Sequence, residues 1–249
     1  MKLLILCVDG LDPDYAEENG FARFPYQQKL SIPKECYVMT EEGEAPHTTK
    51  VWPTIFSGKP IGNMQKIRGP LRQRVHDFLV KKKVTWDFAE KQYKVNPYNR
   101  ELDLVFNHYN SFIWNIPTIS PAWIAYFPSY NAYIDFVQKE YIQWQILSRG
   151  AIHYPFELIA TYTRILDSWG HNKPDKLDTL YLDIVTYAEE ISKHIPTILV
   201  SDHGCLNGIH THKAYIGSTE PIKANSVTEV RHDIETIIAH ARITESSIL

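Results

Sequence analysis

Three apolar stretches of this 249-residue chain each lead into an aspartate, and this pattern constrains the fold most strongly. The stretches and their aspartates are residues 3–8 with Asp9, residues 156–163 with Asp167, and residues 197–201 with Asp202. Short runs that are apolar throughout are typical of strands buried on both faces, as in parallel sheets. The pattern therefore predicts three central strands, each with a carboxylate at or just beyond its end.

Helical patterns alternate with these runs. They predict helices over residues 129–147, 175–193 and 226–240, and further short strands over 36–39 and 213–217. Such alternation indicates an α/β fold with a mostly parallel central sheet and helices on both faces. Because ligands bind at the carboxyl ends of strands in such sheets, we expect the three aspartates to meet in space.

The middle of the chain has a different texture. From residue 84 to residue 150 it is crowded with Trp, Tyr and Phe, and prolines break it into short pieces. We therefore predict a core formed by residues 1–58 and 155–249, with residues 59–154 as an aromatic-rich, cap-like insertion.

Composition excludes several classes of protein. A net charge of −3 without a long basic run argues against extended nucleic acid as a partner. No stretch approaches the roughly 20 apolar residues that span a bilayer, and the run at 3–8 is too short for a signal peptide. Three scattered cysteines, Cys7, Cys36 and Cys205, argue against a disulfide framework and favour a reducing compartment. We expect a cytoplasmic protein; the oligomeric state stays open.

Histidines accompany two of the aspartates. His203 follows Asp202 directly, and His171 stands four residues after Asp167. Asp and neutral His are good ligands for zinc, manganese or iron. Gly170 and the residues after His171 oppose a helix, so we expect Asp167 and His171 on a loop that turns both side chains toward one ion.

A further pair, His210 and His212, follows the Asp202 segment. In an extended chain the two side chains point the same way. We favour His210 as a metal ligand and place His212 toward the substrate.

The segment from His47 to Gly58 contains a candidate nucleophile. Coordination by a divalent cation lowers the pKa of a Thr hydroxyl and makes it reactive. Residues 53–56 predict a short helical turn that Gly58 ends, and a Thr at a helix start lets backbone N–H groups hold phosphate oxygens. An ordinary helix cap is the alternative reading of this Thr.

Taken in order, these motifs resemble those of the alkaline phosphatase superfamily, particularly its type I phosphodiesterase/nucleotide pyrophosphatase branch. That branch has an Asp after the first strand, a nucleophilic Thr or Ser, an Asp-x-x-x-His, an Asp-His-Gly and a late His. Thr48 and Gly58 have the separation of its nucleophile segment, although Lys50 replaces a Pro. That departure leaves Thr48 and Thr49 both open as nucleophile, with Thr48 favoured by spacing. The resemblance covers residues 1–60 and 155–217.

The resemblance implies two divalent metal ions, with zinc or manganese first and iron as an alternative. The implied ligands are Asp167, His171 and His210 at one site, and Asp9, Asp202, His203 and the Thr48 oxygen at the other. The implied mechanism is a two-step displacement through phosphothreonine, in which Lys50 or His47 could hold a phosphate oxygen.

The substrate expected from the resemblance is a small phosphoester. Aromatic rings in the insertion could stack a nucleobase, so we favour a nucleotide-type phosphodiester or pyrophosphate. The alternatives are a phosphomonoesterase or phosphomutase of a small phosphorylated metabolite, and a non-catalytic nucleotide-binding relative.

Overall fold

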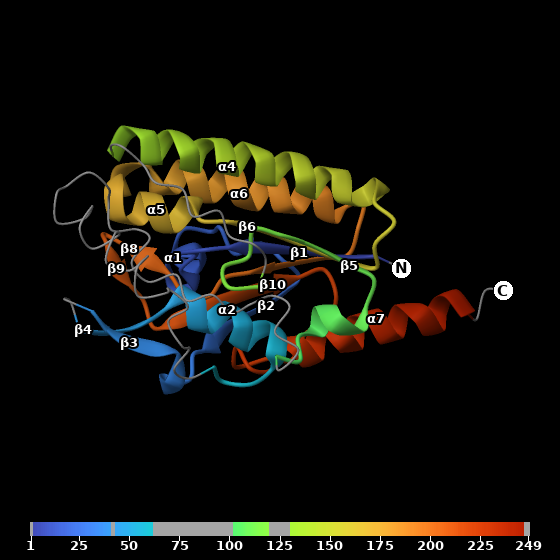
Figure 1. The fold of residues 1–249 in the computed structure, drawn as a ribbon. Helices are drawn as coiled ribbons and strands as arrows, with labels where there is room; N and C mark the ends of the chain where they lie inside the picture. The colour runs from blue at the N-terminus through green and yellow to red at the C-terminus, as the bar shows by residue number, and fades with distance from the viewer. Residues whose placement is uncertain (1, 41–42, 62–101, 120–129, 247–249) are drawn as a thin grey trace, which may run out of the picture.

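The fold is built around a six-stranded sheet (Figure 1). Its strands are β1 (Leu3–Val8), β2 (Tyr26–Ser31), β5 (Ser111–Trp114), β6 (Leu158–Thr163), β7 (Thr197–Val200) and β10 (Lys213–Ser218). Across the sheet they follow the order β2-β10-β7-β1-β6-β5. The computed structural model describes residues 2–40, 43–61, 102–119 and 130–246.

The parallel part of the sheet comprises β7, β1, β6 and β5. Strand β1 lies between β6 and β7, and all six of its residues have no exposed surface. A strand buried on both faces has no polar side to present, which explains its uninterrupted apolar sequence. At the other edge, β10 and β2 pair antiparallel. The predicted mostly parallel sheet is confirmed.

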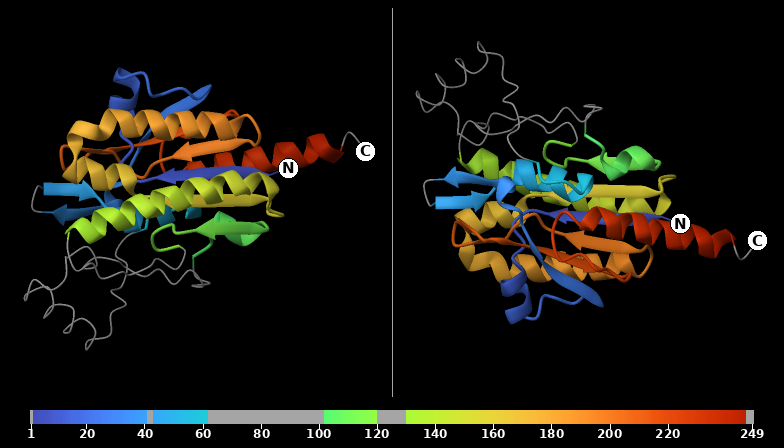
Figure 2. Two further views of the ribbon diagram at one scale, coloured as in Figure 1. Left: turned by 90° about the horizontal axis from the view of Figure 1, so that it is seen from above. Right: turned by 90° about the horizontal axis from the view of Figure 1, so that it is seen from below.

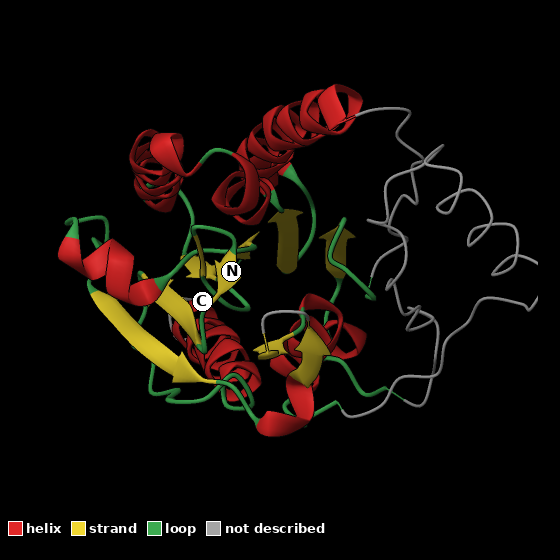
Figure 3. Cartoon of the chain, turned by 90° about the vertical axis from the view of Figure 1, so that its left-hand side faces the viewer, coloured by secondary structure: helices red, strands yellow, loops and turns green. Residues whose placement is uncertain are grey.

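Helices cover both faces of the sheet, as predicted (Figures 1 and 2). One face carries α4 (Tyr130–Gly150), α5 (Ile165–Asn172) and α6 (Leu177–Ser192), and the other carries α2 (Thr48–Ser57) and α7 (Val230–Ser246). Seen end-on, the sheet lies between these two helical layers (Figure 3). Each layer closes its own apolar core against the sheet. The short helix α1 (Pro13–Glu18) follows β1.

Two pieces of residues 59–154 lie in these layers. Strand β5 extends the sheet beside β6, and α4 packs on the sheet face. On α4, the Trp144 ring is fully buried, its Nε1 donates to the Thr161 carbonyl at 3.3 Å, and Tyr133 is 4% exposed. These aromatic side chains are therefore core, because an amphipathic helix buries its large rings against the sheet. Residues 62–101 and 120–129 lie outside the described residues, so the cap stays a prediction.

Two small hairpins complete the fold near the carboxyl end of β1. One joins β3 (Tyr37–Thr40) to β4 (Gly43–Pro46), and the other joins β8 (Cys205–Leu206) to β9 (Ile209–His210). Single 3-10 turns occupy Lys34–Cys36, Val105–His108, Ala151–His153 and Pro174–Lys176. Within the described ranges, no helix has the length and apolar character needed to cross a bilayer.

Candidate metal centre

The three aspartates converge at the carboxyl end of the parallel strands, as expected. Asp9 follows β1 directly, Asp202 comes two residues after β7, and Asp167 lies in α5, which begins just after β6. The backbone fixes this arrangement, because the Asp167 N–H donates to the Asp9 carbonyl at 3.0 Å and the Asp9 N–H donates to Thr163 at 2.9 Å. Ligand atoms of Asp9, Asp167 and His203 all lie within 4.8 Å of one another.

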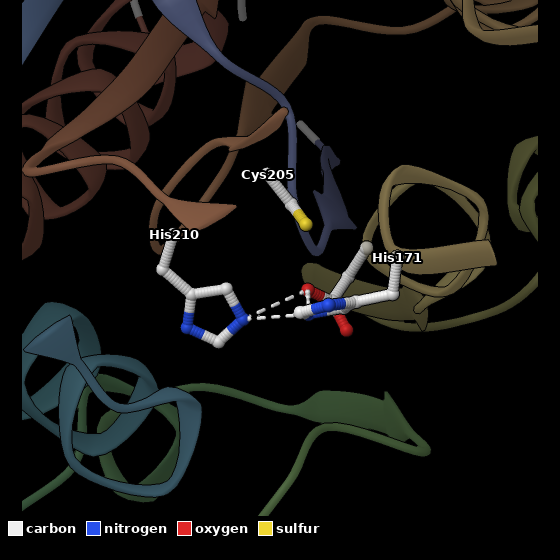
Figure 4. Close-up of side chains that lie close together, drawn as sticks. His171, Cys205 and His210 are labelled. Atoms are coloured by element: carbon white, nitrogen blue, oxygen red, sulfur yellow. Dashed lines mark hydrogen bonds and ion pairs between the residues drawn. The ribbon is translucent and has the colours of Figure 1, made fainter. Parts of the chain in front are cut away.

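A first group of ligand atoms comes from Asp167, His171 and His210 (Figure 4). Asp167 Oδ1 lies 3.4 Å from His171 Nε2 and 3.2 Å from His210 Nε2, and the two Nε2 atoms are 3.0 Å apart. Both rings have solvent access, since the His171 side chain is 39% exposed and that of His210 is 25% exposed. The group therefore opens to solution on its histidine side.

The predicted loop between Asp167 and His171 is wrong, because these residues lie on helix α5. On a helix, residues four apart share one face, which brings the carboxylate and the imidazole together. Pro174 does not oppose this helix, because it comes after the C-cap residue Lys173, whose N–H donates to the Trp169 carbonyl at 2.7 Å. Burial of Ile165 and Leu166 anchors the first turn.

A second group surrounds His203. Its Nε2 lies 3.4 Å from Asp9 Oδ1, 3.4 Å from Asp202 Oδ2 and 3.0 Å from Thr48 Oγ1. The His203 and His210 rings stack with centroids 4.2 Å apart, so the two groups adjoin. A carboxylate oxygen of Asp167 lies within 4.8 Å of ligand atoms in both groups.

The protonation of His203 follows from its surroundings. Its Nδ1 lies 3.1 Å from the Gly204 carbonyl oxygen, which can only accept a hydrogen bond. Nδ1 therefore carries the proton, and Nε2 presents a lone pair to Asp9, Asp202 and Thr48. A backbone carbonyl on the distal nitrogen is how metal-binding histidines are usually oriented.

Several buried carboxylate oxygens in the centre accept no hydrogen bond from any described residue. They are Asp9 Oδ1, Asp202 Oδ1 and Asp202 Oδ2. Buried charges without donors are costly unless they are paired or bind metal. Four ligands at about 2.0–2.1 Å from a tetrahedral ion lie about 3.3 Å from one another, close to the 3.0–3.4 Å separations found here. The donor set thus fits two adjacent divalent cations.

Burial and mutual repulsion shift the acid–base properties of the buried carboxyl groups. Burial, with the negative charge of Asp167, raises the pKa of Asp9 to about 7. Burial and the charge of Asp9 also raise the pKa of Asp202 well above its usual range. Two carboxyl groups that resist ionisation side by side indicate a site suited to a compensating positive charge.

The histidines shift in opposite directions. Burial lowers the pKa of His203 to about 3, so this imidazole is neutral at physiological pH. Burial opposes protonation of His210 as well, but hydrogen bonding and the charge of Asp167 raise its pKa to about 9. In the metal-free protein, His210 therefore carries a proton that a cation must displace.

Helix α2 positions the candidate nucleophile. It begins at Thr48 after the N-cap residue His47, whose Nδ1 accepts from the Thr49 N–H at 3.3 Å, and it ends before Gly58 in the left-handed conformation. The Thr49 hydroxyl lies 2.7 Å from the same His47 nitrogen, whereas Thr48 Oγ1 faces His203. Thus Thr48 is the threonine whose oxygen adjoins the second ligand group.

The helix is longer than the turn predicted at residues 53–56, because a tertiary contact compensates for its internal proline. Pro53 has no N–H to donate to the Thr49 carbonyl four residues earlier. The Thr118 hydroxyl shares its single proton between that carbonyl, at 3.3 Å, and the Pro117 carbonyl, at 2.6 Å. Residues 48–57 therefore form one continuous helix with its first turn at the centre.

The remaining predicted substrate residues lie around the centre. The Lys50 ammonium is turned away from it and donates to the carbonyls of Glu35 and Tyr37 at 3.0 and 2.9 Å. His47 caps α2. His212 lies outside the ligand groups and stacks on Tyr37, with ring centroids 5.5 Å apart and planes 8° from parallel. Of the two late histidines, only His210 joins the described ligand groups.

Two residues of the centre carried no sequence signal. The Cys205 sulfur lies with Asp167, His171 and His210, all four ligand atoms being within 4.8 Å of one another. The Tyr162 hydroxyl donates to Asp9 Oδ2 at 2.5 Å. Tyr162 reads as an ordinary strand residue, and Cys205 reads as a buried cysteine, because their roles depend on neighbours far away in the sequence.

Comparison with known proteins bears on the fold. No protein-family model and no curated protein matches the chain. Among solved structures, alkaline phosphatase from the Antarctic bacterium TAB5 aligns over 96% of this chain and 97% of its own, with 9% identity and a TM-score of 0.50.

Two other structures align less closely. A Vibrio parahaemolyticus protein of the alkaline phosphatase superfamily covers 95% of this chain and 66% of its own, at 11% identity and a TM-score of 0.46. Murine ectonucleotide pyrophosphatase/phosphodiesterase 5 covers 82% and 57%, at 15% identity and a TM-score of 0.42. The alignment with the TAB5 enzyme shows that the chain has the alkaline phosphatase fold, so the resemblance seen in the motifs is confirmed for the architecture.

Proposed function

We propose that this protein is a metal-dependent phosphoester hydrolase with Thr48 as nucleophile and zinc or manganese as its two divalent ions. We further propose that its substrate is a nucleotide-type phosphodiester or pyrophosphate. One observation carries the proposal. Thr48 Oγ1, Asp9 Oδ1 and Asp202 Oδ2 all lie 3.0–3.4 Å from the same atom, His203 Nε2.

The site has the parts that phosphoryl transfer needs. Bound divalent ions supply the positive charge that lowers the pKa of a Thr hydroxyl and stabilises charge on the transferred group. Thr48 stands at the first residue of α2, where the helix dipole favours an incoming anion. Asp9, Asp202 and His203 would hold one ion, and Asp167, His171 and His210 the other.

The reaction follows from these positions. The Thr48 hydroxyl gives its proton to solvent, and its oxygen forms a bond to phosphorus while the bond to the leaving oxygen breaks on the opposite side. The departing oxygen takes up a proton from solvent. With a phosphodiester, this step leaves the phosphoryl group on the Thr48 oxygen, still esterified to the part of the substrate that has not departed. Water then forms a new bond to phosphorus, the bond to the Thr48 oxygen breaks, and the free hydroxyl is restored. Such covalent catalysis divides one difficult step into two easier ones.

Two features favour a nucleotide substrate. The segment from Thr48 to Gly58 resembles the nucleophile segment of the phosphodiesterase/nucleotide pyrophosphatase branch. In addition, Tyr37 and His212 form a flat stacked pair, and His212 is two residues from His210. A nucleobase stacked on an aromatic ring gains about 1–3 kcal/mol.

The proposal is tested with bis-p-nitrophenyl phosphate beside p-nitrophenyl phosphate, after EDTA treatment and after zinc or manganese is restored. Metal-dependent preference for the diester supports it. Preference for the monoester favours a phosphomonoesterase or a phosphomutase of a small phosphorylated metabolite. No turnover of either compound with both metals bound would leave an enzyme with a narrow natural substrate or a non-catalytic nucleotide-binding protein. Asp202→Asn, purified in parallel, controls for contaminating phosphatase and should contain less metal.

A further inference from the structure

The sulfur of Cys205 lies beside the ligand group formed by Asp167, His171 and His210. The β8–β9 hairpin brings it there, because Cys205 and His210 are directly opposite each other in the antiparallel pair. Residues opposite each other in such a pair project from the same face. The thiol and the imidazole therefore point together toward His171 on α5, as Figure 4 shows.

The packing of α5 on β8 keeps the thiol at this place. Gly170, next to His171, lies so close to the hairpin that a Cβ there would be 2.6 Å from the Cys205 carbonyl oxygen and 2.7 Å from its sulfur. The Gly208 N–H donates to the Gly170 carbonyl at 2.9 Å, which ties the turn of the hairpin to α5. Cys205 itself has no exposed surface. The sulfur is thus enclosed on the protein side of the group, opposite the solvent-accessible histidines.

We propose that Cys205 is a fourth protein ligand of this ion, as a thiolate. The four ligand atoms lie within 4.8 Å of one another, so a movement on the order of 1 Å closes them around a tetrahedral ion with a zinc–sulfur bond of about 2.3 Å. The thiol proton leaves to solvent when the sulfur–metal bond forms. This proposal rests on the proposed function only because both concern the ion held by Asp167, His171 and His210.

A thiolate ligand would change both the net charge of the site and its preference among divalent metals. Asp167 alone supplies one negative charge to a divalent ion, and a thiolate beside it makes the site neutral. Thiolates also favour zinc over manganese or magnesium, which prefer oxygen ligands. We infer that this ion is a tightly held zinc ion, while the reacting oxygen of Thr48 belongs to the neighbouring group.

The direct test is X-ray absorption spectroscopy of the zinc-loaded Thr48→Ala protein, in which turnover plays no part. The expected result is a sulfur shell at about 2.3 Å. Because Cys205 binds only one of the two zinc ions, the average is half a sulfur per zinc. Adding Cys205→Ser should remove this shell, and adding Cys36→Ser should not. Cys36 is a matched control because it is equally buried, its sulfur lies within hydrogen-bond distance of the Thr54 hydroxyl, and it belongs to neither of the described ligand groups.

A competition experiment gives an independent readout. In a zinc–manganese mixture, the intact protein should retain zinc at this site. Cys205→Ser should lower zinc affinity by about a hundredfold or more, because loss of a direct ligand costs at least as much as the 10–100-fold lost with an outer partner. Gly170→Ala, which displaces the thiol without removing it, should also weaken zinc binding. Two bound zinc ions without a sulfur shell would overturn the Cys205 ligand and leave the proposed function intact. A protein that binds no metal would overturn both.

Discussion

The Thr48 hydroxyl oxygen lies 3.0 Å from Nε2 of His203, although 155 residues separate the two in the chain. This contact joins the first residue of α2 to the segment that follows β7. The Gly204 carbonyl fixes the proton on Nδ1 of His203. The other ring nitrogen, Nε2, faces Thr48 and carries a lone pair that can bind a metal. The fold therefore brings the candidate nucleophile and a candidate metal ligand together.

Removal of the Tyr162 hydroxyl should weaken metal binding without disrupting the core. This hydroxyl donates to Asp9 Oδ2, and the ring packs edge-on against Trp52 with centroids 5.7 Å apart. Tyr162→Phe retains the ring but leaves Asp9 without its donor. We expect affinity for zinc to fall about 10–100-fold, as for other partners of metal ligands.

The affinity is measured by titration against a chelator of known zinc affinity. Tyr215→Phe is the matched control, because Tyr215 on β10 is also buried. Its hydroxyl donates to Gln27 on β2, at 3.3 Å, and not to a candidate metal ligand. Equal zinc affinity in the Tyr162 variant and the wild type would contradict the role given to this hydroxyl.

Metal binding should release protons below about pH 9. The pKa of His210 is raised to about 9 and that of Asp9 to about 7, so in the metal-free protein both groups hold protons at pH values below these. A cation binds only their deprotonated forms, so affinity rises with pH until His210 is fully deprotonated. Calorimetric titration with zinc in two buffers of different ionisation enthalpy gives the number of protons released. Release should be larger at about pH 6.5 than at about pH 9.5; no difference would contradict these shifts.

A methyl group at Gly10 should destabilise the whole centre. Gly10 has φ of +84°, and a Cβ there would lie 2.4 Å from the backbone nitrogen of Asp167, which donates to Asp9. We expect Gly10→Ala to lower the free energy of unfolding by roughly 2–5 kcal/mol through strain and overpacking. Gly20→Ala separates these causes, because Gly20 has φ of +70° but nothing within 4 Å. Urea unfolding that gives equal losses for both variants would refute the close approach.

Part of the fold is readable from the sequence because burial leaves a direct mark on it. Strands β1, β6 and β7 are buried throughout, so β1 is a continuous apolar run and β6 and β7 are mostly apolar, with threonine as their polar residue. Strand β2 shows no such signal, since only Leu30 of its six residues is buried. The density of aromatic residues led us to place β5 and α4 in an insertion, although β5 pairs with β6 and α4 packs on the sheet. Aromatic rings are as common in a core as in a cap, so their number alone does not distinguish the two.

The site was readable to a similar extent. Asp9, Asp167 and Asp202 are predictable as neighbours because parallel strands end at one edge of a sheet. Helix α5 was missed because Gly170 is a poor helix former, and only its packing against Cys205 explains the glycine. The Cys205 contact depends on the register of a two-residue hairpin, which no periodicity in the sequence predicts.

The most direct test of the central claim compares Thr48→Ala with Thr49→Ala in the metal-loaded protein. Both variants should bind two metal ions and unfold at nearly the same temperature as the wild type. Thr48→Ala should lower kcat for the preferred phosphoester by roughly 10⁴-fold or more, because the nucleophile is lost. Thr49→Ala should remain active, since the Thr49 hydroxyl is bound to His47. Full activity in Thr48→Ala with metals bound would contradict the account.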